Sequence, residues 1–527
     1  MLPRPTLIAI VLAGVLAAGL HTAALAEGDN ELGKAAFDNS CGEAVQPQLQ
    51  RAVALLHSFW WDQSEAAFRG VLQRDPSCTI ATWGIATVRI GNPFGAGPTA
   101  ADAKVAQAAL ALGAQTPPKT ERERDYIKAV ASYYEFYPAK PHAARIRALA
   151  DAFERLAVTY RDDDETQIFF GLYLAGTQSP FEKSLERANR AIVILNEQFA
   201  KHPDHPGVAH YMIHANDFPS IAARGLVAAN CYAGIAPAAP HALHMPSHIF
   251  TRVGLWQQSA ETNRKSRDAA KLADHITDQL HAYDYWEYAD LQLARDEEAG
   301  EIVSLSRELV EPNRPSDYAR AAIPARFAVE RGQWQDAAHL PDPDQSRFPY
   351  TSAIRFFARA LGAARSGDPE AAERDLARLE EAETAMAAAQ DRYWVAEIEV
   401  QALAAQAWIA EARGARERAL LLMREAADKE DSSEKSSVSP GRLVPARELL
   451  GDMLFEQGKA ADALAAYEAT QKRDPKRFRS LFGAGRAAAT VGATDKAKAY
   501  YTQLIDMSGS ASPRPELAMA RAWLGDH

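Results

Sequence analysis

The chain has 527 residues, of which 47% are hydrophobic and 24% are charged, and its formal net charge is −11. This acidic balance argues against nucleic acid or an anionic membrane surface as a partner, because both are polyanions. The length and composition allow either one extended core or several smaller ones.

The first 26 residues have the features of a secretory signal peptide. Arg4 stands near the start, an apolar run extends from about Leu7 to Leu20, and Ala24-Leu25-Ala26 forms a small-x-small cleavage site. The alternative, an uncleaved membrane anchor, is disfavoured because the apolar run is short. We therefore expect a mature chain without a membrane span, located in the periplasm or secreted after cleavage near Ala26.

The rest of the chain is predicted to be all-α. Alanine-rich amphipathic stretches recur, as in residues 447–475, and alternating β-branched runs are almost absent. Three polar stretches are predicted as loops: Arg161 to Glu165, Pro341 to Gln345, and Asp428 to Gly441. The last of these, residues 428–441, is expected to be a solvated linker.

The clearest repeat signal lies near the C-terminus. Small, aromatic and proline residues follow a fixed spacing at Gly451, Gly458, Ala463, Tyr467 and Pro475, and again 34 residues later at Gly485, Gly492, Ala497 and Tyr501. This spacing resembles that of tetratricopeptide-repeat (TPR) proteins, in which small residues let two paired helices approach closely. The resemblance implies a solenoid of helix hairpins, wound as a right-handed superhelix, in an exported bacterial protein.

A turn pattern, Gly-x4-Ala with Ser once, extends this frame toward the N-terminus. It occurs at Gly254/Ser259, Gly332/Ala337, Gly367/Ala372, Gly414/Ala419, Gly458/Ala463 and Gly492/Ala497. Uneven spacings between these turns predict a solenoid with insertions. The predicted organisation is a signal peptide (1–26), TPR-like repeats with a central histidine-rich groove (27–427), the polar linker (428–441) and C-terminal repeats (442–527).

The three cysteines are assigned from the first hairpin, in which Phe68 and Pro76 fit the repeat spacing. Cys41 precedes this hairpin and Cys78 follows it, and an antiparallel hairpin returns the chain to the same end. In an oxidising compartment we expect a Cys41–Cys78 disulfide. Cys231 is then unpaired and is expected to be a buried thiol, with a metal ligand or a reactive thiol as the alternatives.

Histidine is concentrated in the middle of the chain, where seven of the 14 histidines lie between residues 202 and 248. His210 and His214 are four residues apart, as are His244 and His248, and the two pairs are offset by 34 residues, one TPR period. Residues four apart share a helix face, and packed helices lie about 8–10 Å apart. These four histidines are therefore candidate ligands of one metal site in the concave groove.

The same repeat frame adds further candidates to this groove. Additional metal ligands could come from Asp217, His241, His281 and Asp284, and groove or ligand contacts from Thr251 and Tyr288. Three or four imidazoles suit Zn(II), Cu(II) or Ni(II), and Met245 could offer Cu(I) a soft contact. His202 and His205 lie in a proline-flanked turn and are expected to be solvated.

Aromatic residues near these candidates are ambiguous. Phe59, Trp60, Trp61 and Trp83 are expected to pack the first hairpins. The loop 92–98 carries Phe94, which can cap the groove, and the sequence does not decide whether it does.

The sequence leaves three roles open for the histidines: hydrogen bonding or peptide contact, metal binding, and acid–base catalysis. An HExxH motif is absent, and so are a nucleophile elbow, a P-loop and a dinucleotide-binding motif in the necessary context. The leading hypothesis is an exported scaffold that binds a peptide, a protein or a cell-envelope component through its groove. The alternative is a Zn- or Cu-binding protein, or a metal-dependent enzyme, that uses the same groove.

Overall fold

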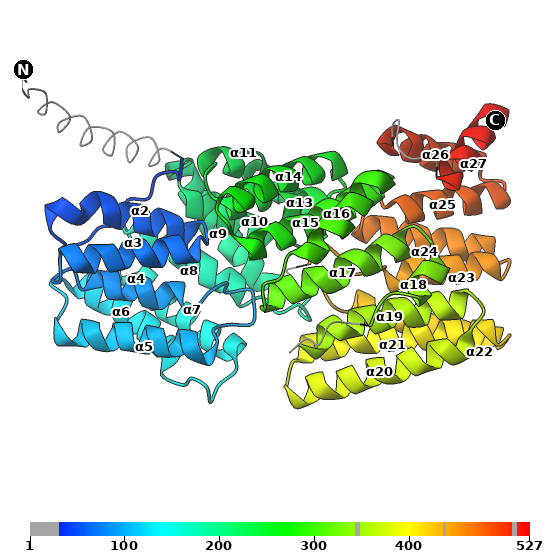
Figure 1. Ribbon diagram of the computed structural model, residues 1–527. Helices are drawn as coiled ribbons and strands as arrows, with labels where there is room; N and C mark the ends of the chain where they lie inside the picture. Colours follow the sequence, from blue (N-terminus) through cyan, green and yellow to red (C-terminus); the bar gives the residue numbers. More distant parts are fainter. Residues whose placement is uncertain (1–30, 343–347, 436–438, 509–513) are drawn as a thin grey trace, which may run out of the picture.

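A computed structural model describes residues 31–342, 348–435, 439–508 and 514–527 (Figure 1). Every regular element in these ranges is a helix, and consecutive helices pack against one another, which is the predicted all-α solenoid of helix hairpins. None of these helices is both long and apolar enough to cross a membrane. The predicted signal peptide, residues 1–26, lies outside the described residues.

The N-terminal block stacks its helices as successive hairpins. Its elements are η1 (Glu43–Val45), α2 (Gln46–His57), α3 (Trp61–Arg74), α4 (Ile80–Val88), α5 (Ala100–Gln115), α6 (Glu121–Tyr134), α7 (His142–Thr159), α8 (Asp164–Gly176) and α9 (Glu186–Lys201). The predicted disulfide is confirmed, because Cys41 and Cys78 are bonded across the first hairpin. The predicted loop after α7 ends earlier than expected, because Asp163 caps α8 by accepting from the Thr166 backbone N–H.

The central block contains the histidine-rich segment. Its elements are α10 (Pro206–Asn216), η2 (Ala222–Gly225), α11 (Leu226–Ile235), α12 (Pro240–His244), α13 (Pro246–Arg252), α14 (Trp256–Leu272), α15 (Ile276–Gln292), α16 (Asp296–Glu308) and α17 (Arg314–Glu330). Proline lacks a backbone donor, and Pro246 stands where α12 gives way to α13. His244 and His248 therefore lie on two consecutive short helices.

The C-terminal block continues the stack on the right of Figure 1. Its elements are α18 (Trp334–Ala338), α19 (Pro349–Arg365), α20 (Pro369–Ala388), α21 (Arg392–Ala412), α22 (Arg416–Asp431), α23 (Ala446–Glu456), α24 (Ala460–Arg473), α25 (Phe478–Thr490), α26 (Thr494–Ser508) and α27 (Pro515–Asp526).

The repeat signature read from the sequence is confirmed in the turns and the helix contacts. All six predicted turn glycines adopt a positive φ between 63° and 88°, and the Ala or Ser five residues after each one is fully buried. A Cβ atom on Gly451 would lie 2.7 Å from the ring of Tyr467. The small residue thus lets the aromatic ring of the paired helix pack directly on the backbone.

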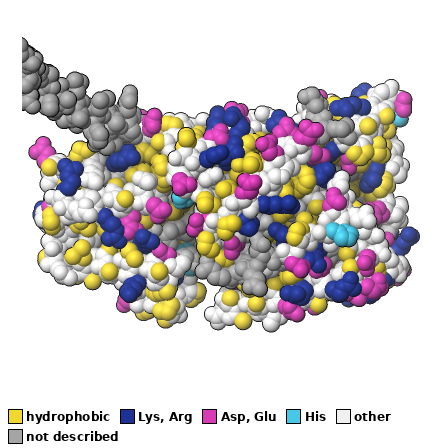
Figure 2. Space-filling view, in the orientation of Figure 1, with side chains coloured by type: hydrophobic (Ala, Val, Ile, Leu, Met, Phe, Trp, Pro, Cys, Tyr) yellow, Lys and Arg dark blue, Asp and Glu magenta, His cyan; other side chains and the backbone are white. Residues whose placement is uncertain are grey.

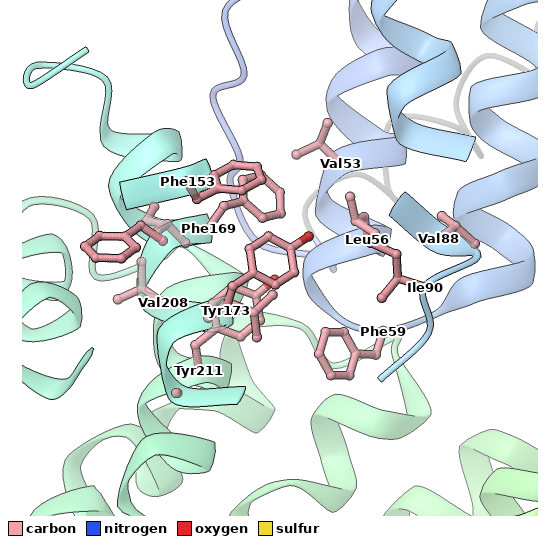
Figure 3. Packing of buried hydrophobic residues seen from close by; sticks show 14 of the residues in the cluster. Val53, Leu56, Phe59, Val88, Ile90, Phe153, Phe169, Tyr173, Val208 and Tyr211 are labelled. Atoms are coloured by element: carbon pink, nitrogen blue, oxygen red, sulfur yellow. The ribbon is translucent and has the colours of Figure 1, made fainter. Parts of the chain in front are cut away.

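The buried side chains form separate clusters along the stack, the largest in the N-terminal and early central blocks. In that cluster, Leu56, Phe59 and Ile90 converge with Phe169, Tyr173 and Tyr211 (Figure 3). On the face shown in Figure 2, hydrophobic side chains are scattered among charged ones. Most of the large hydrophobic side chains are therefore buried between helices.

The described residues of the polar stretch, 428–435 and 439–441, do not form the solvated linker that the composition predicts. Helix α22 runs to Asp431, and Ser433, Glu434, Lys435 and Ser439 are buried. Contacts with a distant part of the chain explain this burial. The Glu434 backbone N–H donates to the Pro180 carbonyl, and the Glu434 carboxylate pairs with Lys183 at 2.9 Å. This segment therefore joins the C-terminal block to the N-terminal one.

Candidate metal centre

Six histidines come together in the central block, from helices α10, α12, α13 and α15. Helix α12 contacts α13 and α15, and α13 contacts α10; α10, α13 and α15 lie side by side in Figure 1. They form two groups of three, and within each group one ring nitrogen per residue lies within 4.8 Å of the others. The first triad is His210, His214 and His241, and the second triad is His244, His248 and His281. The structure thus brings together the four main candidates and two of the additional ones.

The two triads form one continuous array of rings. Ring centroids within a triad lie 4.2 to 6.5 Å apart. Between the triads, His214 and His248 are 5.8 Å apart, and His241 and His244 are 6.0 Å apart. The distances between the triads fall within the range found inside each triad, so the two triads are immediate neighbours.

These histidines lie in the interior and do not line an open groove as predicted. His210, His214, His244 and His248 are each at most 5% exposed, while His241 and His281 are partly buried. Aromatic residues cover the first triad: Phe94 stacks on His214 at 4.2 Å, and Phe59 packs edge-on against His210 at 4.3 Å. The loop 92–98 therefore does cap this site.

Hydrogen bonds fix the orientation of three rings. The Nδ1 atom of His210 donates to the His57 carbonyl at 2.7 Å. The Nδ1 atom of His244 donates to Asn263 Oδ1 at 2.7 Å, and that of His248 donates to Asp217 Oδ2 at 3.0 Å. Since these oxygens are acceptors, each Nδ1 carries the proton and each Nε2 presents a lone pair. Metal-ligating histidines are held in this way.

The second triad brings two of these lone pairs face to face. The Nε2 atoms of His244 and His248 lie 3.0 Å apart, and neither has a proton to donate. Two lone pairs at this distance repel each other unless a metal ion or a proton lies between them, and burial disfavours the proton because it lowers the pKa of both histidines. A tetrahedral metal ion with bonds of about 2.0–2.1 Å would hold two nitrogens about 3.3 Å apart.

The first triad contains an imidazole without hydrogen bonds. Both ring nitrogens of His214 are buried, and within the described part of the chain neither has a partner. Buried polar atoms are nearly always hydrogen-bonded, so an orphaned imidazole indicates a ligand that the protein itself does not supply. The Nε2 atoms of His210 and His241 lie close by, 3.2 Å apart.

The two predicted carboxylate ligands are occupied by cations. Asp217 pairs with Arg252 at 2.7 Å and with Lys435 at 3.3 Å. Burial alone would raise the pKa of Asp217, but the two cations and the hydrogen bond from His248 outweigh burial and lower that pKa. Asp284 pairs with Arg326 at 2.5 Å, and burial raises its pKa. Asp217 therefore orients His248, and Asp284 belongs to a separate buried ion pair.

The remaining candidates make their contacts elsewhere. Thr251 is hydrogen-bonded to Ser259 at 3.0 Å, and the Tyr288 hydroxyl accepts from Arg477 at 2.5 Å. The Cys231 thiol is half-buried and donates to the Ala228 carbonyl, and burial raises its pKa. None of the three belongs to a histidine triad.

A third buried group was missed from the sequence, and it changes the expectation for His205. Glu165 accepts from His57 Nε2 at 2.9 Å and from His205 Nε2 at 3.0 Å. The Nδ1 atoms of these histidines accept from the Tyr211 hydroxyl and the Val208 backbone N–H. His205 is therefore buried, not solvated, and all protons in this Glu165 network are accounted for without a metal ion.

Comparisons with known proteins leave the function open. No family model and no curated protein matches the chain. Among solved structures, it is similar to a tetratricopeptide repeat protein from Parabacteroides merdae, with 14% identity over 54% of this chain and 97% of that one and a TM-score of 0.29.

Two other solved structures are similar over more of the chain. The human IFIT1 dimer with m7Gppp-AAAA has 11% identity, covering 82% of this chain and 90% of that one, with a TM-score of 0.38. Yeast Tom70 has 9% identity, covering 92% and 96%, with a TM-score of 0.34. Similarities this weak assign no function.

Proposed function

We propose that this protein binds transition-metal ions at its six clustered histidines, one ion in each triad. The observation that carries the proposal is the pair of unprotonated Nε2 atoms of His244 and His248, 3.0 Å apart in a buried site. Imidazole donors without carboxylates suit zinc, copper or nickel and disfavour calcium and magnesium.

Each triad supplies three protein ligands. Closed structural zinc sites have four protein ligands, whereas sites with three leave a position open for a small exogenous molecule. The triads therefore support a site that binds or transforms a ligand. Residues 1–26 support the further proposal that the protein works outside the cytoplasm, where the chain would acquire its metal after export.

The helix hairpins hold the imidazole nitrogens of the two triads in place. Buried histidines are poorly placed to contact a peptide, so a peptide-binding role for them is disfavoured. Helical repeats commonly present extended surfaces to other proteins, and a peptide or protein partner on another face of the solenoid remains a compatible proposal.

The test uses the untagged mature chain, because a polyhistidine tag would itself bind metal. Zn(II) binding is measured by calorimetry for the wild type and for the double variant His214→Gln/His248→Gln, with helix content checked by circular dichroism. We expect at least 100-fold weaker binding in the double variant. The matched control is His202→Gln/His339→Gln, which changes two histidines outside the triads and should bind as the wild type does. Equal, weak uptake by all three proteins would refute the proposal.

A further inference from the structure

The charges around the triads favour a metal ion of low charge. All six donors are neutral imidazoles, and the nearest acid, Asp217, is already paired with Arg252 and Lys435. The cost of burying an ion grows steeply with its charge, so a singly charged ion costs less to bury in this site than a divalent one. Cu(I) has a single charge, accepts three nitrogen donors and binds imidazole.

The adjacency of the triads favours a shared ligand. Ring centroids lie 5.8 and 6.0 Å apart across the boundary, and the six rings are contiguous. Each triad supplies three ligands, so an ion in either triad would keep one coordination position open, and the two ions would be neighbours. A small molecule could then bind both ions at once.

A small cavity lies next to Phe59, whose ring packs on His210 of the first triad. It has a volume of about 10 Å³ and is lined mainly by hydrophobic side chains, including Leu56, Ile90 and Phe169, and by no triad histidine. A cavity of this size holds about one water-sized molecule. It therefore offers room for one small neutral molecule one aromatic ring away from the first triad.

Building on the proposed function, we propose that the two triads hold a coupled pair of copper ions that binds dioxygen. Each Cu(I) ion gives up one electron and becomes Cu(II). Dioxygen gains both electrons and becomes a peroxide dianion held between the ions, so the step needs no proton and no external reductant. Release of dioxygen reverses the transfer.

The experiment loads the full mature chain with Cu(I) without air, counts the copper, and then admits dioxygen. The expected result is two copper ions per chain, uptake of one dioxygen per two copper ions, and loss of nearly all the paramagnetic Cu(II) signal through coupling. The variant His281→Ala, which changes a partly buried ligand of the second triad, should hold one copper ion. After chemical oxidation that single ion should give a full paramagnetic signal, and the variant should take up no dioxygen.

The outcomes separate this inference from the proposed function. Two bound copper ions with full paramagnetic signals, or without dioxygen uptake, would overturn the coupled pair and leave metal binding intact. Zinc uptake without Cu(I) uptake would also overturn the copper assignment alone. Failure to bind either metal would overturn the proposed function itself. His202→Gln serves as the control and should behave as the wild type.

Discussion

The Lys435 ammonium group lies 3.3 Å from the Asp217 carboxylate, although 218 residues separate them in the sequence. Asp217 follows the end of α10 and also holds Arg252 and the Nδ1 atom of His248. One buried carboxylate thus connects the segment after α22, the helix α13 and the second triad.

Replacing Asp217 by Asn should weaken both the fold and the metal site. Arg252 and Lys435 would lose their shared counter-ion, and breaking a buried pair of this kind costs about 3–5 kcal/mol. Loss of a carboxylate that orients a metal-binding histidine typically lowers affinity about 10–100-fold. Urea unfolding and calorimetry with Zn(II) measure the two effects.

The control for this variant is Asp342→Asn. Asp342 is 88% exposed and pairs with Arg359, so its loss should change stability by less than about 1 kcal/mol. A similar result for the Asp217 and Asp342 variants would contradict the role given to Asp217.

The acid sensitivity of the metal site should begin below the usual histidine range. Burial holds the pKa of five triad histidines well below 6.5, namely His210, His214, His241, His244 and His281. Only the unfolded chain gains protons at these residues as pH falls through 6.5, so the metal-free protein should lose stability below that pH.

Metal affinity should follow the same rule, since a neutral imidazole is the ligand. We expect nearly constant affinity from about pH 7.5 to 6.5 and a fall only at lower pH. The sequence alone predicts a fall centred on the unperturbed pKa. Calorimetric titrations across this pH range distinguish the two expectations. A tenfold loss of metal affinity already complete at pH 6.5 would contradict the burial of these histidines.

Asp290 gives a pH-dependent prediction away from the metal site. Neither carboxylate oxygen has a hydrogen bond in the described structure, and Arg295 approaches only to 3.5 Å. Burial outweighs this cation and raises the pKa of Asp290 to about 7. The folded state keeps a proton that the unfolded state releases near pH 4, so this group makes stability fall as pH rises from about 4 to 7.

Asp290→Asn removes this effect because an amide stays neutral. The variant should be more stable than the wild type at pH 8 by about 1–3 kcal/mol, and the two should differ little at pH 4.5. Thermal unfolding at both pH values provides the measurement. Equal destabilisation of the variant at both pH values would show that the carboxylate makes stabilising contacts.

Phe94→Ala should open the first triad. The Phe94 ring stacks on His214 with an angle of 16° between the planes, from a loop outside the helices that carry the ligands. We expect a chelator to remove metal at least ten times faster from this variant, with helix content unchanged. Phe181→Ala changes an exposed ring and is the control. Equal removal rates in the two variants would argue that Phe94 does not cover the site.

Local patterns explain which parts of the structure the sequence predicts. The turn glycines and the small residues after them determine the hairpins, and the four-residue spacing of His210 and His214 places both on α10. These features depend on residues close together in the chain.

The parts that were missed depend on contacts between distant segments. The Glu165 network joins α2, α8 and the start of α10, and no spacing in the sequence links those helices. Lys435 lies in a segment whose composition is typical of a solvated loop, and only its contact with Asp217 explains its burial. Asp217 was predicted as a metal ligand, but because it pairs with Lys435 it instead orients the ligand His248.

The number of metal ions held by one folded chain tests the central claim most directly. Native mass spectrometry of the untagged mature protein, loaded with Zn(II) and freed of excess metal, should show two ions in the wild type. One ion should remain in His241→Ala and one in His281→Ala, because each variant removes a ligand from a different triad. The double variant should hold none. A single ion in the wild type that both single variants lose, or no bound ion at all, would contradict a centre built from two histidine triads.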